Sequence, residues 1–203
     1  MRTCLLAVLF AMAGFQAQAD TAAACGEAAE LHRSGQFSEA VDRYGDCLKA
    51  IDDDPAAVAD AYHRRGRAQM KLGDLNAAMT DYDLAIAVAP GHAGAWNSRA
   101  WVLYLEGDHE TALLAVDQAL AFEPESVRSL DTRGHILAAL GRDADAMAAF
   151  DQAMTLQTPA GVVKTQDHLR AAGYDPGPSD GVYGPLTREA LTACVADACN
   201  IWN

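Results

Sequence analysis

The sequence predicts an all-α protein: an α-α superhelix of about four helical hairpins, followed by a small helical domain. Three observations lead to this fold class. Glycine, alanine and proline recur at intervals of 34 residues through the middle of the chain. The segments between them are rich in alanine, the strongest helix former. The stretch at 173–187, GYDPGPSDGVYGPLT, breaks this pattern, because its four glycines and three prolines are incompatible with a helix.

Residues 1–19 have the order of a secretory signal peptide. A basic start at Arg2 precedes an apolar run over residues 5–15, and Ala17-Gln18-Ala19 has the small-x-small pattern of a signal-peptidase site. The run is short for a permanent membrane helix, and an uncleaved anchor or a core helix is the alternative. We therefore expect a periplasmic protein cleaved after Ala19.

The predicted mature chain is strongly acidic. Cleavage removes one of the 15 basic residues and none of the 28 acidic ones, so the net charge becomes 14 − 28 = −14. Nucleic acids and anionic membrane surfaces require clustered cations. The charge therefore argues against a nucleic-acid partner and, together with cleavage, against stable membrane insertion.

The 34-residue period predicts one helical hairpin per repeat. Gly73, Gly107 and Gly141 would supply the turn inside each hairpin, where glycine tolerates the required backbone conformation. Asp74 is placed to cap the second helix of its hairpin. Small residues at equal distances from the turn, such as Gly66 and Ala78, would allow the two helices to approach closely.

These residues resemble the tetratricopeptide repeat, whose pattern is an aromatic residue, Gly, a turn Gly, Ala, an aromatic residue, Ala and a closing Pro. The second, third and fourth units match at Tyr62, Gly66, Gly73, Ala78, Tyr82, Ala85 and Pro90; at Trp96, Ala100, Gly107, Ala112, Val116, Ala119 and Pro124; and at Leu130, Gly134, Gly141, Ala146, Phe150 and Ala153. A weaker first unit carries Ala28, Gly35, Ala40, Tyr44 and Cys47. The resemblance implies a repeat array over 20–158, with units at 22–50, 59–90, 93–124 and 127–158.

In this family the first helices of the repeats line a ligand-binding groove. Mapped onto the chain, the groove residues are His63, Arg67, Met70, Lys71, Asn97, Trp101, Tyr104, Arg128, Asp131 and His135. This set is basic with an aromatic centre, whereas the protein as a whole is acidic. It indicates an anionic or C-terminal peptide ligand, unless these side chains only solvate the groove.

Two charged positions also recur every 34 residues and predict a structural ladder of ion pairs. The arginines are Arg65, Arg99 and Arg133, and the aspartates are Asp83, Asp117 and Asp151. Because a specific site seldom repeats in every unit, we interpret them as structural.

The stretch at 173–187 is predicted to be a loop between two helices of a separate domain over 160–203. Thr187 is a candidate N-cap for the second helix, and Leu191 would lie on its buried side. The segment resembles the peptidoglycan-binding domain attached to cell-wall hydrolases, through Val163, Gln166, Leu169, Gly173, Tyr174, Asp180, Gly181, Tyr183, Gly184 and Thr187. The resemblance implies glycan binding, for which the candidate residues are Tyr174, Asp180, Tyr183, Thr187 and Arg188.

Four cysteines remain after cleavage, an even number that indicates disulfides in an exported protein. Four cysteines allow three pairings. Cys25 and Cys47 lie at nearly equal distances from Gly35, so a bridge between them would staple the first hairpin. Cys194 and Cys199 could pair if the last helix ends near Ala196.

No catalytic constellation, metal-ligand spacing or cofactor motif emerges from the sequence. We therefore expect a non-enzymatic adaptor, in which the repeats bind an envelope protein and the C-terminal domain associates with peptidoglycan. The alternative is an accessory or regulatory subunit of an envelope enzyme, with both domains binding protein and no glycan affinity.

Overall fold

The computed structural model describes residues 24–197, and within them every regular element is an α-helix. The predicted all-α class is therefore confirmed. The predicted signal peptide and Cys199 lie outside the described residues. Residues 24–33 are helical, and the further helices are α2 (Phe37–Ala50), α3 (Pro55–Lys71), α4 (Leu75–Val88), α5 (Ala93–Leu105), α6 (His109–Phe122), α7 (Val127–Ala139), α8 (Asp143–Leu156), α9 (Pro159–Ala171) and α10 (Pro185–Ala196).

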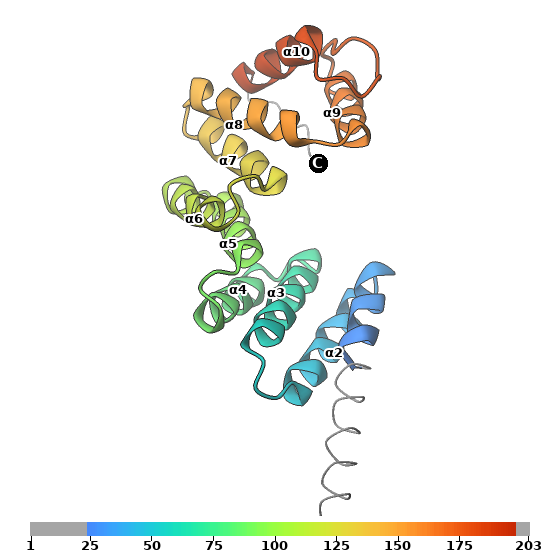
Figure 1. The fold of residues 1–203 in the computed structure, drawn as a ribbon, viewed down its shortest axis with the longest axis vertical. Coiled ribbons are helices and arrows are strands. Elements are labelled where there is room, and N and C mark those ends of the chain that lie inside the picture. Colours follow the sequence, from blue (N-terminus) through green and yellow to red (C-terminus); the bar gives the residue numbers. More distant parts are fainter. Residues whose placement is uncertain (1–23, 198–203) are drawn as a thin grey trace, which may run out of the picture. The chain divides into compact units, whose positions relative to one another are not determined.

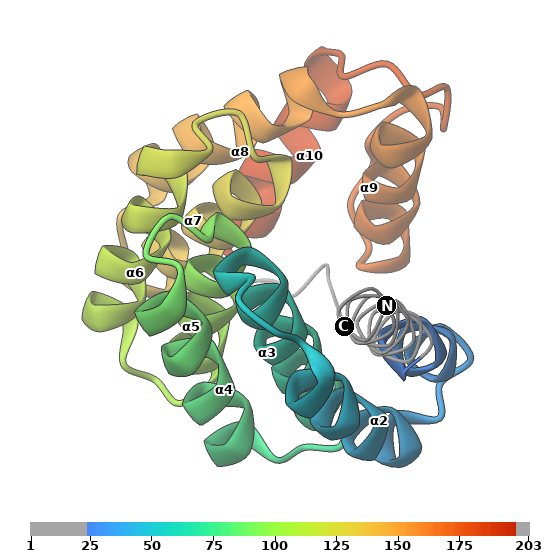
Figure 2. The same ribbon diagram turned by 60° about the horizontal axis from the view of Figure 1, so that its bottom comes forward.

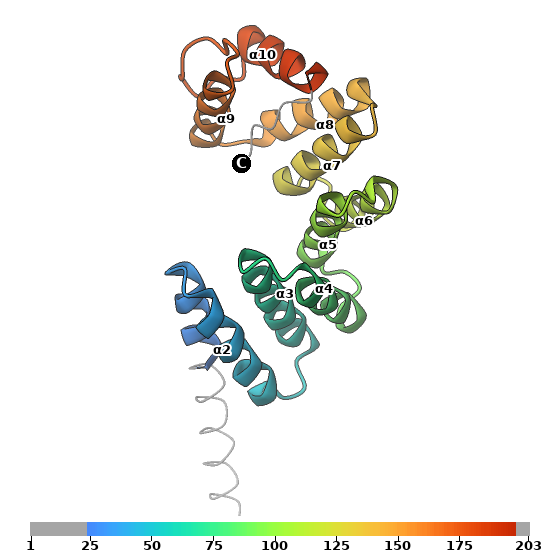
Figure 3. The same cartoon turned by 180° about the vertical axis from the view of Figure 1, so that it is seen from behind.

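The chain divides into two compact units between Ser98 and Arg99, inside α5. In the first unit, α3 forms a hairpin with α4 and packs on its other side against α2 (Figure 2). In the second unit, α7 and α8 form a hairpin that packs through α7 against α6 (Figure 1). The loop between α9 and α10 arches away from both helices (Figure 3), and α10 packs against α8 and α9.

The turns inside the hairpins follow from local chemistry. The turn glycines at 35, 73, 107 and 141 all have φ between +69° and +84°, a conformation that residues with a Cβ rarely adopt. Asp74 then caps α4, because its side chain accepts the N–H of Ala77 at 3.0 Å, as predicted. Asp108 caps α6 in the same way.

A small residue faces a large one where the two helices of a hairpin meet. A Cβ on Gly66 would lie 2.7 Å from the ring of Tyr82, and a Cβ on Gly134 would lie 2.5 Å from the ring of Phe150. Both rings are buried. The third repeat has Ala100 at the corresponding position, and the residue opposite it in the repeat pattern is the smaller Val116. The helices therefore approach closely because the two positions are matched in size.

The first hairpin is closed by a disulfide. Cys25 and Cys47 are bonded, with their Cα atoms 4.8 Å apart, which confirms this predicted pairing. The bridge joins the start of the helical segment 24–33 to the end of α2. A terminal repeat has only one neighbouring repeat to stabilise it, and a covalent cross-link offsets part of this deficit.

Cys194 is also disulfide-bonded. Because Cys199 lies outside the described residues, the predicted Cys194–Cys199 pairing stays a prediction.

Over residues 24–197, no helix has the length and apolar character needed to cross a membrane.

Candidate functional site

In the first unit, the predicted groove residues divide into buried and accessible ones. His63 and Asn97 are only 9% and 4% exposed, so they cannot form an open groove surface as predicted. The His63 ring lies within 3.0 Å of the Ser98 hydroxyl, measured from Nε2 to Oγ. Arg67 and Met70 are half-buried, and only Lys71 is exposed. The solvent-accessible surface that these residues form is therefore smaller than the sequence predicted.

The fold also brings together Asp60, His63 and His92, whose candidate ligand atoms all lie within 4.8 Å of one another. The spacing of histidines along the sequence did not predict this cluster. These groups do not fit a metal ion as they stand. Nδ1 of His92 accepts the backbone N–H of Ala95, so in the neutral ring Nε2 carries the proton and no lone pair is left for a metal. Asp60 already accepts a hydrogen bond from Arg64 at 2.6 Å.

In the second unit, the aromatic groove residues form a real cluster. The rings of Trp101 and Tyr104 are stacked, with their centroids 5.0 Å apart, and both side chains remain partly accessible. The rings of Trp101 and His135 meet edge to face, and His135 in turn contacts Phe150. Three of the predicted groove residues, Trp101, Tyr104 and His135, therefore contact one another, but His135 is buried and not exposed as a groove residue would be.

Asp131 lies one turn before His135 on α7, with its Oδ2 atom 3.8 Å from Nε2 of His135. Burial raises the pKa of Asp131 to about 7 and lowers the pKa of His135 to about 4. Both groups are therefore stabilised in their neutral forms. One third of the Asp131 side chain is still accessible to solvent, so a ligand could reach its carboxyl group. Arg128, the remaining predicted groove residue, is exposed on the same helix.

The loop between α9 and α10 folds around Gln166, which is 1% exposed. The amide of Gln166 donates to Asp180, to the carbonyl of Val182 and to the hydroxyl of Thr187, at 3.0–3.1 Å. Its oxygen accepts the N–H of Gly181 at 3.1 Å. These bonds hold the loop in one conformation, and the hydrogen bond from Gln166 lowers the pKa of Asp180.

Thr187 is not the N-cap of α10, so this part of the prediction is wrong. The N-cap is Gly184, and Pro185 opens the helix. Thr187 lies inside the first turn, is 2% exposed, and donates to the carbonyl of Pro176 at 3.0 Å. Its hydroxyl therefore stabilises the loop and is not accessible to a glycan.

Tyr183 and Arg188 both bind Asp151 on α8. Arg188 makes a two-pronged ion pair with this carboxylate, with a shortest distance of 2.8 Å, and Tyr183 donates its hydroxyl to the same group. Burial opposes ionisation of Asp151, but the bonds from Arg188 and Tyr183 lower its pKa overall. Tyr174, the last of the predicted glycan-binding residues, donates to Asp197 at 2.9 Å.

The predicted ladder of charged residues is present in part. Arg133 on α7 pairs with Asp117 on α6 at 2.8 Å, which is a link between consecutive repeats. Arg65 instead pairs with Asp81 of its own hairpin at 2.7 Å. Asp151 occupies the ladder position in the last repeat and is paired with Arg188 from the C-terminal domain.

Matches to known families agree with these features. The tetratricopeptide repeat family matches residues 59–92 and 127–158, and the putative peptidoglycan binding domain matches residues 158–194. No curated protein matches the chain.

Solved structures share the fold at low sequence identity. A thermophilic TPR protein of Thermus thermophilus, TTC0263, has a TM-score of 0.63 at 20% identity, covering 87% of this chain and 98% of that one. YrrB, described as a TPR protein with an unusual peptide-binding site, has a TM-score of 0.55 at 18% identity, covering 69% and 70%. The first TPR of Spaghetti (RPAP3), solved with the HSP90 peptide SRMEEVD, has a TM-score of 0.55 at 20% identity, covering 60% and 96%.

The packed helical hairpins define a helical-repeat protein. More particularly, the chain contains tetratricopeptide repeats followed by a peptidoglycan-binding-like domain.

Proposed function

We propose that the protein is a non-enzymatic periplasmic adaptor. Its repeats hold a segment of an envelope protein, and its C-terminal domain brings the complex to the cell wall. Repeat proteins of this fold generally act as scaffolds, and neighbours of the same fold were solved with a peptide or are described with a peptide-binding site. The signal-peptide pattern of residues 1–19 supports export and cleavage after Ala19.

The observation that carries the proposal is the stacked Trp101–Tyr104 pair, whose rings contact His135, the neighbour of Asp131. Partly accessible aromatic side chains next to polar groups dominate many protein interfaces. Both side chains keep partial solvent access, so a bound segment can contact them. The pair therefore supports this part of the repeat surface as the place where a protein segment binds.

The test is capture of a partner from envelope extract by the purified protein, followed by measurement of its affinity. Trp101→Ala should weaken binding by about 30-fold, the equivalent of a hot spot worth ~2 kcal/mol. Leu114→Ala is the matched control, because Leu114 is also a large apolar side chain but lies 70% exposed on α6. Equal losses in the two variants, or none, would contradict the groove assignment.

One observation favours the alternative, an accessory subunit with no glycan affinity. Tyr183 and Arg188, which the resemblance implies for glycan binding, are both bound to Asp151. Co-sedimentation of the whole protein with purified sacculi separates the two functions. Asp151→Ala would remove the acceptor to which both side chains are bound, so sacculus binding should increase if they bind glycan. If neither the wild-type protein nor the variant binds sacculi, the result supports the accessory subunit without glycan affinity.

A further inference from the structure

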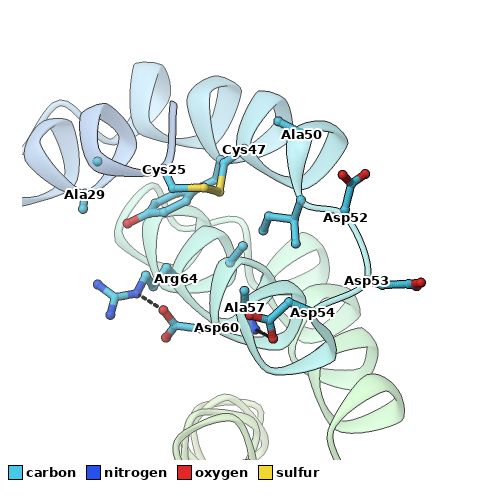
Figure 4. A pocket seen from close by; sticks show the side chains of 14 residues that line it. Cys25, Ala29, Cys47, Ala50, Asp52, Asp53, Asp54, Ala57, Asp60 and Arg64 are labelled. Carbon is cyan, nitrogen blue, oxygen red and sulfur yellow. Dashed lines mark hydrogen bonds and ion pairs between the residues drawn. A yellow bond between two sulfur atoms is a disulfide. The ribbon is translucent and has the colours of Figure 1, made fainter. Parts of the chain in front are cut away.

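A cavity of about 610 Å³ lies beside the disulfide of the first hairpin (Figure 4). We call it the first-hairpin pocket. Its walls come from three parts of the first unit: the start of helical segment 24–33, the end of α2, and the beginning of α3 with the loop before it. All these parts belong to the same compact unit.

The floor of the pocket is apolar. It consists of the disulfide, the ring of Tyr44, Ile51 and small side chains including Ala29 and Ala57. Tyr44 and Cys47 are themselves almost fully buried. Alanine at the facing positions of two neighbouring helices leaves space that larger side chains would fill. An apolar group entering this space would be removed from water, which favours binding in proportion to the area buried.

The mouth of the pocket is negative. Its lining residues include Asp52, Asp53, Asp54 and Asp60, and Arg64 is the one cation among them. Four carboxylates and one guanidinium give a net charge of −3. Arg64 is itself paired with Asp60 at 2.6 Å. The C-terminal end of α2 adds the partial negative charge of its last carbonyl groups, which also favours a cation.

A metal ion is a poor match for this charge. The side chains of Asp52 and Asp53 point in different directions rather than toward one point (Figure 4), and the carboxylate of Asp54 is used to cap α3 through the N–H of Ala57. The candidate ligand cluster found in residues 24–197 includes only Asp60 from this rim. A charged group at the mouth attached to an apolar stem in the pocket satisfies both halves of the site. Lysine and arginine side chains have this form.

We propose that the first-hairpin pocket binds a basic, apolar segment of a protein, with an aliphatic or lysine stem on the apolar floor and cationic groups at the aspartate rim. This rests on the protein-binding function proposed above, but it assigns a second surface and a ligand of opposite charge to the anionic one expected from the sequence.

The probe is a fluorescent peptide of alternating lysine and leucine, titrated with the whole protein at low salt. Asp52→Asn with Asp53→Asn should weaken binding about fivefold, because two exposed carboxylates near a cation together contribute about 1 kcal/mol. Glu39→Gln with Asp42→Asn is the matched control, which removes two exposed acids of α2 outside the pocket and should change binding little. Ala57→Leu, which fills the pocket without altering charge, should also weaken binding.

Other results would overturn the proposal. A lysine–glycine peptide or spermidine that binds as tightly would show that the apolar floor plays no part. Equal losses in the pocket and control variants would indicate only a general attraction to an acidic protein. Absence of binding to the folded protein would refute the pocket directly. If Trp101→Ala abolishes peptide binding and the pocket variants do not change it, the peptide binds at the aromatic cluster. This result would refute the pocket but not the protein-binding function proposed for the repeats.

Discussion

Gly134→Ala tests whether the hairpins depend on size-matched helix contacts. The added Cβ would lie 2.5, 2.6 and 2.7 Å from three carbons of the Phe150 ring. That ring is 3% exposed and has little room to move. Overpacking of this kind costs about 1–3 kcal/mol, and such short contacts place the cost near the upper end. Alanine recovers about 1 kcal/mol through its higher helix propensity. The free energy of unfolding should therefore fall by ~2 kcal/mol.

The third repeat supplies the control, because it has Ala100 at this position and Val116 opposite it in the repeat pattern, both fully buried. In a Phe150→Val background the clash is gone, so Gly134→Ala should become stabilising by about 1 kcal/mol. Urea unfolding followed by circular dichroism measures both backgrounds. Because coupled repeats can unfold in parts, hydrogen exchange of α7 and α8 should accompany it. The same sign of effect in both backgrounds would refute the size-matching argument.

The remaining predictions concern the disulfide and two carboxyl groups. Cys25→Ala with Cys47→Ala removes a disulfide whose cysteines are separated by 22 residues in sequence. The loop-closure relation predicts that the free energy of unfolding falls by about 3 kcal/mol, and unchanged hydrogen exchange over 24–50 would contradict this prediction. Burial raises the pKa of Asp131 to about 7, so the folded state binds the proton of this carboxyl group more tightly than the unfolded state does. The free energy of unfolding therefore falls as the pH rises from about 4 to about 7. Asp131→Asn should thus raise the melting temperature above pH ~7 and leave it nearly unchanged at pH ~4. An equal change of melting temperature at the two pH values would argue against a raised pKa of Asp131. Burial and the bond to Asp151 raise the pKa of Tyr183, so Asp151→Asn should lower it in a spectrophotometric titration, and no change would show that burial alone sets it.

Repeat hairpins were predictable because their determinants are local. A glycine with positive φ and an aspartate cap act within a few residues, so Gly73 and Asp74 reveal a turn and a helix start without knowledge of the rest. The Cys25–Cys47 bridge followed from the same geometry, since a hairpin turn at Gly35 brings the two positions level.

The sites were less predictable because they depend on which way a side chain faces and on contacts across long separations. His63 and Arg67 lie one turn apart on α3, yet only His63 is buried. Helical spacing alone predicts which residues share a face of the helix, but not how deeply each of them is buried. The sequence identified Gln166 only as a residue that matches the peptidoglycan-binding pattern. Its hydrogen bonds to loop residues 14–21 positions away could not be predicted from sequence spacing.

The contact of Asp151 with Arg188 has a practical consequence for dissecting the protein. The last repeat and the C-terminal domain share this carboxylate, so a cut between residues 158 and 160 would leave a half-buried acid without its cation and expose the face of α8 that α10 covers. An isolated C-terminal fragment would in turn present Tyr183 and Arg188 without Asp151, to which both are bound in the intact chain. Glycan affinity measured on such a fragment would therefore overstate the affinity of the protein, and cell-wall binding is best compared between whole chains that differ only at residue 151.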